Sequence, residues 1–294
     1  MDVTNLTGLE KPLEKLIEVF AEGLGETANV MFKLDARKIK RIGDAEAEVE
    51  KNKIIKLAEG KAESVEIFMR AGKRFALEQY TKQVNLENIF IGAKEALEGS
   101  TVSDQPVDKD WAFRFMNIAQ DVSREDMQKI LSKILAEEIK SPNSFSLRTL
   151  DFIKNLSKSD LLLFKKAAMI SDDINIHISK INANEGFFNI SYGDIMKMIE
   201  IGFIQSGLST VLNFGDVEDS QVYSIFLKNK NNYSFKFIEK QKDITLPILQ
   251  LTTIGRELSI LIELEDDDND LISQYIEELK KYWQTKKLEF MFIN

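Results

Sequence analysis

The chain contains no cysteine, one histidine and only four prolines among its 294 residues. Without cysteine it can form neither a disulfide bond nor a thiolate metal site, and the cytosol is the expected compartment. The single histidine, His177, excludes metal sites built on histidine pairs and leaves acid–base chemistry to carboxylates and lysines. We therefore expect no metal and no cofactor. The scarcity of proline imposes few breaks, so long helices are expected.

Other absences narrow the class of protein. No segment approaches the roughly 18 consecutive apolar residues of a membrane-spanning helix, and the N-terminus lacks the basic start and apolar run of a signal peptide. The net charge of −9 argues against general affinity for polyanions, because phosphate binding needs a concentrated basic face. Phosphate-binding loops, dinucleotide-binding glycine motifs and nucleophile elbows are missing too. What is present is a chain long enough for two domains, 44% hydrophobic and 30% charged.

The N-terminal region, residues 1–98, is predicted to be helical and to self-associate. A short amphipathic helix comes first, and a proline-free stretch at 33–97 follows. In that stretch, small and apolar residues recur at spacings of three and four, so a partner helix could approach closely, as in a coiled coil. The members of this seam are Ala58, Ala62, Val65, Met69, Gly72, Ala76 and Tyr80. We expect a homo-oligomer, and a protein partner as well.

The first amphipathic helix also suggests contact with the inner face of a membrane. A basic cluster at 33–41 follows it, and the two together could lie on an anionic surface. The apolar residues that would enter the membrane are Leu9, Leu13, Leu16 and Phe20. The plainer interpretation is a helix that packs on the rest of the protein with its charges in water.

Residues 99–110 have the Gly, Ser, Asp and Pro content of a linker, and residues 111–171 read as a compact helical module. Ser123 is predicted to cap a helix, with Asp126 three residues on as a capping-box partner. That helix should end before Pro142, because the residue before proline avoids the α conformation. Two further helix starts are predicted at Ser146 and Ser157.

The remaining region, residues 172–294, alternates strand-like runs with three helices and is predicted to be an α+β domain. A strand pair after the helix at 192–201 has the layout of a wing in a winged-helix fold. Its lysines could contact phosphates: Lys228, Lys230 and Lys236. The helix itself offers Lys197 against two acidic residues, a poor surface for reading bases. We therefore do not expect nucleic acid as a partner.

Two further candidate sites have plain alternatives. His177 stands between two isoleucines in an alternating strand and could act in proton transfer. The plain interpretation is a side chain on the solvent face, because no matched Ser, Cys or Asp lies nearby. The acidic run at 263–270 has carboxylates at calcium-loop spacing, but Leu271 occupies the position where such a loop needs glycine. A solvated connection that caps the last helix with Asn269 or Asp270 is the simpler interpretation.

Two motifs stand out in this order of elements. The first begins with Asp121, Ser123, Glu125 and Gln128 in the pattern D-x-S-x-E-x-x-Q and continues through 134–139, Pro142, 144–150 and 156–157. The second is L-T-x-x-G-x-E-L at 251–258. Together they resemble an uncharacterised bacterial family, a domain of unknown function, whose pattern is similar to that of the abortive-infection alpha (Abi-alpha) proteins. Ser132 departs from the pattern, which favours a bulkier residue such as tryptophan.

The resemblance implies association with phage defence and a winged-helix-like C-terminal half, and it implies no catalytic residue. Together with the residue patterns, it predicts a mainly α protein with a long N-terminal helix, a central helical module and an α+β C-terminal domain. The leading functional hypothesis is a non-enzymatic scaffold or sensor in bacterial phage defence that acts by self-association and protein binding. The alternatives are a winged-helix regulator that binds DNA and an enzyme of unrecognised type.

Overall fold

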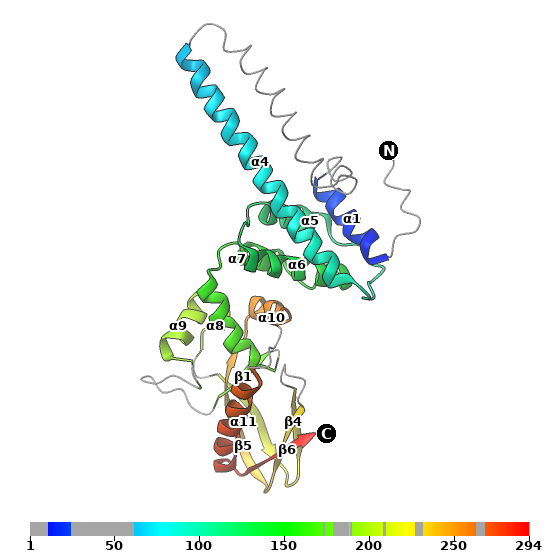
Figure 1. Cartoon of the computed structure of the whole chain (residues 1–294). Helices are drawn as coiled ribbons and strands as arrows, with labels where there is room; N and C mark the ends of the chain where they lie inside the picture. Colours follow the sequence, from blue (N-terminus) through cyan, green and yellow to red (C-terminus); the bar gives the residue numbers. More distant parts are fainter. Residues whose placement is uncertain are drawn as a thin grey trace. The chain divides into compact units, whose positions relative to one another are not determined.

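The chain forms two compact units, residues 1–154 and residues 155–294. The computed structural model (Figure 1) describes residues 11–24, 62–172, 174–178, 188, 190–207, 210–226, 232–262 and 268–293. Among these, the first unit has helices only, and the second combines helices with small antiparallel sheets. The predicted class, helical in bulk with α and β elements towards the C-terminus, is confirmed.

The first unit is a helical bundle in which α4 packs on α6 and α1 packs on α5. The core is aliphatic and aromatic; its fully buried residues include Leu16, Ile89, Phe115, Leu131, Ile134 and Leu150. The described helices are α1 (Lys11–Leu24), α4 (Ala62–Leu97), α5 (Lys109–Ala119), α6 (Glu125–Lys140) and α7 (Leu147–Ile153). Helix α4 is much longer than the others, and its first part extends beyond α5 and α6 (Figure 1).

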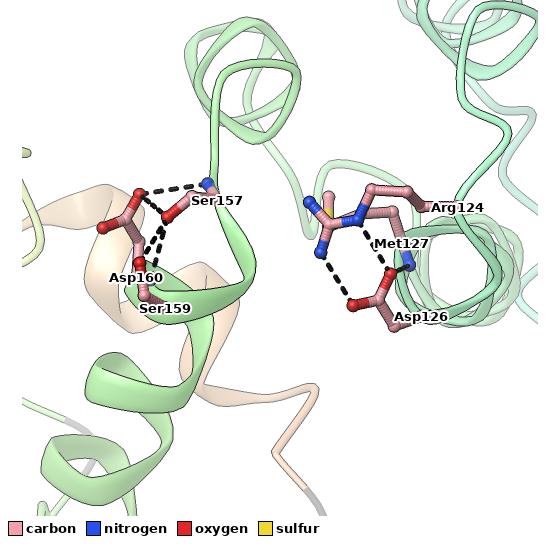
Figure 2. A network of polar contacts seen from close by, with 6 residues as sticks. All are labelled: Arg124, Asp126, Met127, Ser157, Ser159 and Asp160. Atoms are coloured by element: carbon pink, nitrogen blue, oxygen red, sulfur yellow. Dashed lines mark hydrogen bonds and ion pairs between the residues drawn. The ribbon is translucent and has the colours of Figure 1, made fainter.

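Several predicted helix boundaries are confirmed because their signals are local. The Ser146 hydroxyl accepts the backbone N–H of Thr149 at the start of α7. Ser157 and Asp160 form a reciprocal capping box at the start of the next helix, as Figure 2 shows. Helix α6 ends at Lys140, two residues before Pro142, as the restriction on the residue preceding proline predicts.

The predicted cap at Ser123 is wrong. Helix α6 begins at Glu125 after Arg124, and no side chain caps it. The Ser123 hydroxyl instead lies 3.1 Å from the side-chain amide of Asn85 on α4. Asp126 is held by the Arg124 guanidinium, at 2.7 and 3.1 Å, and accepts the N–H of Met127 (Figure 2). The Ser123 hydroxyl therefore bonds to a residue of α4 and does not cap α6.

The structure also divides the chain differently from the predicted boundaries. Residues 99–110 belong to the first unit, because the Ser103 N–H donates to the Lys140 carbonyl and Val107 is buried. Asp108 caps α5 by accepting the N–H of Trp111. The boundary between the units falls at 154–155. A composition typical of a linker also suits a short loop held by backbone hydrogen bonds.

The second unit contains two three-stranded sheets, ordered β1-β5-β2 and β3-β4-β6, with antiparallel neighbours throughout. Its strands are β1 (Asn175–His177), β2 (Val211–Val217), β3 (Val222–Phe226), β4 (Asn232–Phe237), β5 (Gln241–Gln250) and β6 (Leu288–Ile293). Its helices are α8 (Lys158–Met169), α9 (Tyr192–Glu200), α10 (Thr253–Ser259) and α11 (Asp268–Thr285). Phe235 and Phe237 alternate onto the inner face of β4, and Phe235 contacts the Trp283 ring of α11 at 4.9 Å.

The second sequence motif, at 251–258, has a structural role. The Thr252 hydroxyl accepts the Gly255 N–H as the cap of α10 and donates to the Gly202 carbonyl at 2.6 Å. A Cβ atom on Gly255 would stand 2.4 Å from the Phe203 carbonyl oxygen, so only glycine allows this close approach. The motif fixes the start of α10 against the turn that follows α9.

Candidate interaction surface

Helix α4 has two halves with different surroundings, which we call the first half (62–80) and the second half (81–97). The second half is docked in the bundle, where the side chains of Leu86, Ile89, Ala93 and Leu97 are at most 3% exposed. They recur at spacings of three and four and therefore share one face of the helix. This docked face contacts α6 above all.

A neutral polar network lies where the docked half begins. The Asn85 amide donates to the Gln120 carbonyl at 2.8 Å, and its oxygen accepts from Gln128 at 3.1 Å. Gln128 also donates to the Val122 carbonyl at 2.9 Å. Asn85 and Gln128 are 4% and 6% exposed, so the network is buried and its partners fix the register of α4 on α6. Gln128 of the first motif is therefore a structural residue.

Helices α4 and α6 approach closely at Gly92 and Ser132. A Cβ atom on Gly92 would meet the Ser132 Oγ at 2.5 Å. Ser132 is 5% exposed, and its hydroxyl is shared between the carbonyls of Ile89 and Gln128, at 2.9 and 2.8 Å. The departure from the bulkier residue of the resembled pattern is explained here, because a tryptophan has no room between these helices.

The first half of α4 presents a row of uncharged residues to solvent. Phe68 is 51% exposed and Phe75 is 59% exposed, one heptad apart. We call this row the Phe68–Phe75 stripe; its members are Phe68, Ala71, Gly72, Phe75 and Gln79. The opposite side of the helix carries Glu66, Arg70 and Lys73, together with Leu77, which is 67% exposed. Phe75 and Phe68 are the most exposed aromatic side chains in the described part of α4.

The stripe lies beside the predicted self-association seam and overlaps it only at Gly72. Of the seam residues, Ala58 lies outside the described residues, while Ala62 and Val65 lie on α4 with side chains that are not described. Met69, Gly72 and Ala76 are half-buried, and Tyr80 is exposed. Sequence reasoning followed the small residues and missed the phenylalanines. Their seven-residue spacing was the signal that could have identified them.

His177 is where the sequence expectation fails most clearly. Its side chain is buried, not on a solvent face, and its Nε2 atom lies 2.8 Å from an Asp172 carboxylate oxygen. Asp172 is brought there by a turn in which it accepts the N–H groups of Ile174 and Asn175. The Tyr275 hydroxyl donates to the His177 carbonyl at 2.8 Å, which ties β1 to α11. A ring so deeply buried offers no surface to a substrate.

The electrostatics of this cluster agree with a structural role. Burial alone would raise the pKa of Asp172, but hydrogen bonds from His177, Asn175 and Ile174 lower it below its usual value. Burial raises the pKa of Tyr275 well above its usual value, so the phenol stays protonated and donates. The Asp172–His177 pair therefore joins β1 to the turn that precedes it.

Several basic residues of the second unit are paired with carboxylates. Lys197 of α9 contacts Asp160 at 2.5 Å, and this contact with the Ser157 hydrogen bonds lowers the pKa of Asp160 to about 2. Lys240 contacts Glu218 at 2.6 Å. Lys228 and Lys230 lie outside the described residues, and Lys236 is half-buried on β4 opposite Val222 and Glu289.

The acidic run is described only from Asp268, which begins α11 and contacts Lys165 at 3.0 Å. Asn269 and Asp270 lie within the first turn, not before it. Across the described ranges, no group of three or more His, Cys, Asp or Glu side chains could hold a metal ion.

Of the predicted membrane-contacting residues, Leu16 is fully buried in the bundle. Leu9 lies outside the described residues, and the side chains of Leu13 and Phe20 are not described. In the part of the chain that the structure describes, none of the helices has the length and apolar content needed to cross a membrane.

Comparison with known proteins gives one match. No curated protein and no solved structure is similar to the chain. A family described as "Protein of unknown function (DUF2806)" matches residues 69–280, well over half of the sequence. This match begins in the first half of α4 and continues into α11. The chain belongs to the DUF2806 family.

Proposed function

We propose that this protein is a non-enzymatic scaffold or sensor that acts by self-association and by binding a protein partner, in bacterial defence against phage. The observation that carries the proposal is the exposed Phe68–Phe75 stripe. Two phenylalanines with small residues between them gain more from contact with another apolar surface than from contact with water. The defence setting rests on the resemblance of the two motifs to abortive-infection alpha proteins.

What supports a binding role over catalysis is the use that the fold makes of its polar residues. Ser146, Ser157 and Thr252 cap helices, Gln128 fixes a helix register, and His177 joins a strand to a turn. A winged-helix C-terminal part that binds DNA is the alternative. It has less support because Lys197 and Lys240 are paired with carboxylates. A DNA sequence bound in the nanomolar range at about 150 mM salt would favour that alternative.

Self-association is tested by sedimentation velocity over a range of concentrations, with the double variant Phe68→Glu, Phe75→Glu. We expect wild-type dimers or larger species at micromolar concentration and a monomeric double variant, because charges would be buried at the contact. The control is Leu77→Glu, which places one glutamate on the opposite, exposed side and should leave the mass unchanged; each single variant, Phe68→Glu and Phe75→Glu, matches it in charge and should weaken association. A wild-type monomer, or equal loss in the control, would contradict the proposal.

The defence role is tested by phage plaque counts on bacteria that express each variant. We expect protection by wild type and by Leu77→Glu, and none by the double variant, with equal protein levels in immunoblots. Protection by a double variant that is monomeric in solution would show that self-association is not the mode of action.

A further inference from the structure

We infer that the partner of the Phe68–Phe75 stripe is the same stripe of a second copy, with the two α4 helices antiparallel and the two-fold axis between Ala71 and Gly72. The inference rests on the proposed function, because it specifies the surface and the geometry of the self-association. Three features of α4 lead to it: continuity of the stripe with the docked face, the space available along that face, and the order of side chains in the stripe.

The stripe continues the docked face of the same helix. Phe68, Phe75 and Ile89 are separated by multiples of seven residues, so they lie on one side of α4. Ile89 is fully buried against the bundle, whereas Phe68 and Phe75 are exposed. From residue 85 onwards α6 covers this face, whereas in the part of α4 before it Phe68 and Phe75 are exposed. A partner helix on the stripe would extend an existing helix–helix interface.

The space along that face decides the orientation. A parallel partner in register would continue past residue 81 and pack against Asn85 and Ile89. Helix α6 already packs there, through Gln128 and Ser132. Helix axes in contact are about 8–10 Å apart, so both cannot fit. An antiparallel partner centred between residues 71 and 72 places its residue 62 beside residue 81. Over its described length, Ala62–Leu97, α4 of that partner therefore covers the first half and does not reach the part that α6 covers.

The order of side chains is symmetric about the same point. The stripe reads Phe68, Ala71, Gly72, Phe75: aromatic, small, small, aromatic. In the antiparallel pair each Phe68 faces a Phe75 of the other copy, and Ala71 faces Gly72, so the backbones approach closely at the axis. An interface of this kind uses the same patch on both copies, as two-fold dimers require. The charged residues Glu66, Arg70 and Lys73 remain on the solvent side.

The absence of cysteine makes the geometry testable by single substitutions in the full chain. In the inferred dimer, the two Ala71 positions lie about one residue, roughly 1.5 Å, apart along the axis, while the two Gln79 positions are offset by about 22 Å. We expect Ala71→Cys to form a disulfide-linked dimer under mild oxidation and Gln79→Cys to stay unlinked. Both positions are exposed on the same stripe, so random collision would link both variants equally.

The outcomes separate this inference from the proposed function. Linkage of both variants would indicate a parallel pair or collision, and linkage of neither in a chain that sediments as a dimer would place the contact elsewhere. Either result overturns the antiparallel geometry and leaves self-association standing. A wild-type monomer in sedimentation overturns both. Unchanged far-ultraviolet circular dichroism of the two variants confirms that each is folded.

Discussion

The two halves of α4 share one continuous helix and one heptad pattern, yet one half is docked and the other is exposed. The docked half places aliphatic side chains and neutral amides on the shared face, and every polar atom of Asn85 that the network uses has a partner on the α5–α6 loop or on α6. The exposed half places phenylalanines and small residues there, with ion pairs around the other sides. Both halves are therefore helical, and they differ in burial because α6 packs on the second half.

This contrast separates two kinds of contact. The docked half is held by contacts that tolerate one register only, since a shift of one turn would leave Asn85 and Gln128 unsatisfied and separate Gly92 from Ser132. The exposed half offers an apolar surface without polar matching. In the proposed self-association, such a surface suits a contact that forms and dissociates with protein concentration.

The largest expected effect compares a core residue with a stripe residue. Ile89→Ala should lower the free energy of unfolding of the first unit by about 2–5 kcal/mol, because it opens a cavity at a fully buried site. Phe75→Ala should cost less than about 0.5 kcal/mol at concentrations where the chain is monomeric, because that ring is 59% exposed. Urea titrations followed by Trp111 fluorescence, in a Trp283→Phe background, report the first unit alone.

Equal losses for the two variants at low concentration would mean that the first half of α4 is docked within the monomer. The comparison of the halves would then fail, and with it the stripe as a surface for a second copy. A loss for Phe75→Ala that grows with protein concentration would instead sharpen the comparison, because association stabilises the folded state by mass action.

What could be predicted from the sequence follows the range of the interactions. The caps at Ser146 and Ser157 were predictable, since a capping hydroxyl and the backbone N–H that donates to it lie three residues apart. Ser123 was not, because the Asn85 amide that engages it is 38 residues away. The prediction for His177 was wrong for a different reason. Asp172 is near in sequence, but its carboxylate reaches the His177 ring only in the folded turn, in which Asp172 also accepts the Asn175 N–H.

The Phe68–Phe75 stripe lies within the region, residues 33–97, that the sequence predicts to self-associate, and self-association stays a prediction. The sequence places a seam of small and apolar residues along one face of that region, because hydrophobic periodicity is local. Which residues of that face stay exposed depends on where α6 ends its contact with α4, and that is a property of the whole bundle. The sequence pattern alone therefore does not show that Phe68 and Phe75 are exposed while Ile89, on the same side of α4, is buried.

An intermediate effect is expected from the two glycines of α4. Gly92→Ala should destabilise the first unit by about 1–3 kcal/mol, because its Cβ would displace the Ser132 hydroxyl from both of its carbonyl partners. Gly72→Ala, in the exposed half, should be neutral or stabilising by up to about 1 kcal/mol, since alanine is the better helix former. The same fluorescence titrations measure both.

The signs of these two changes matter more than their sizes. Ser132→Gly introduced with Gly92→Ala should recover part of the loss, because it removes the atoms that the new methyl group meets. Two glycines that respond alike to alanine would indicate that helix propensity, and not the contact between α4 and α6, sets the difference between the halves.

The smallest effect is expected at the junction of the halves, where Lys82 lies 2.9 Å from Glu78 and 3.5 Å from Asp121. The hydrogen bond and charge of Lys82 lower the pKa of Glu78 below its ordinary value. A carboxyl with a depressed folded-state pKa stabilises the fold above its unfolded pKa and loses that contribution as the pH falls through the folded value. Glu78 is exposed, however, so solvent and salt screen the pair.

Glu78→Gln should therefore leave the thermal midpoint within experimental error at pH 7. Any small deficit relative to wild type should vanish in acid, where Glu78 itself is protonated, and should shrink in about 1 M salt, where the screening length falls to about 3 Å. A deficit comparable to that of Gly92→Ala would show that the junction is held by charge. If no such deficit is found, the end of the docked half is set by the neutral contacts of Asn85, Gln128 and Ser132, which do not titrate. The exposed half would then stay available for association across the same range of pH and salt.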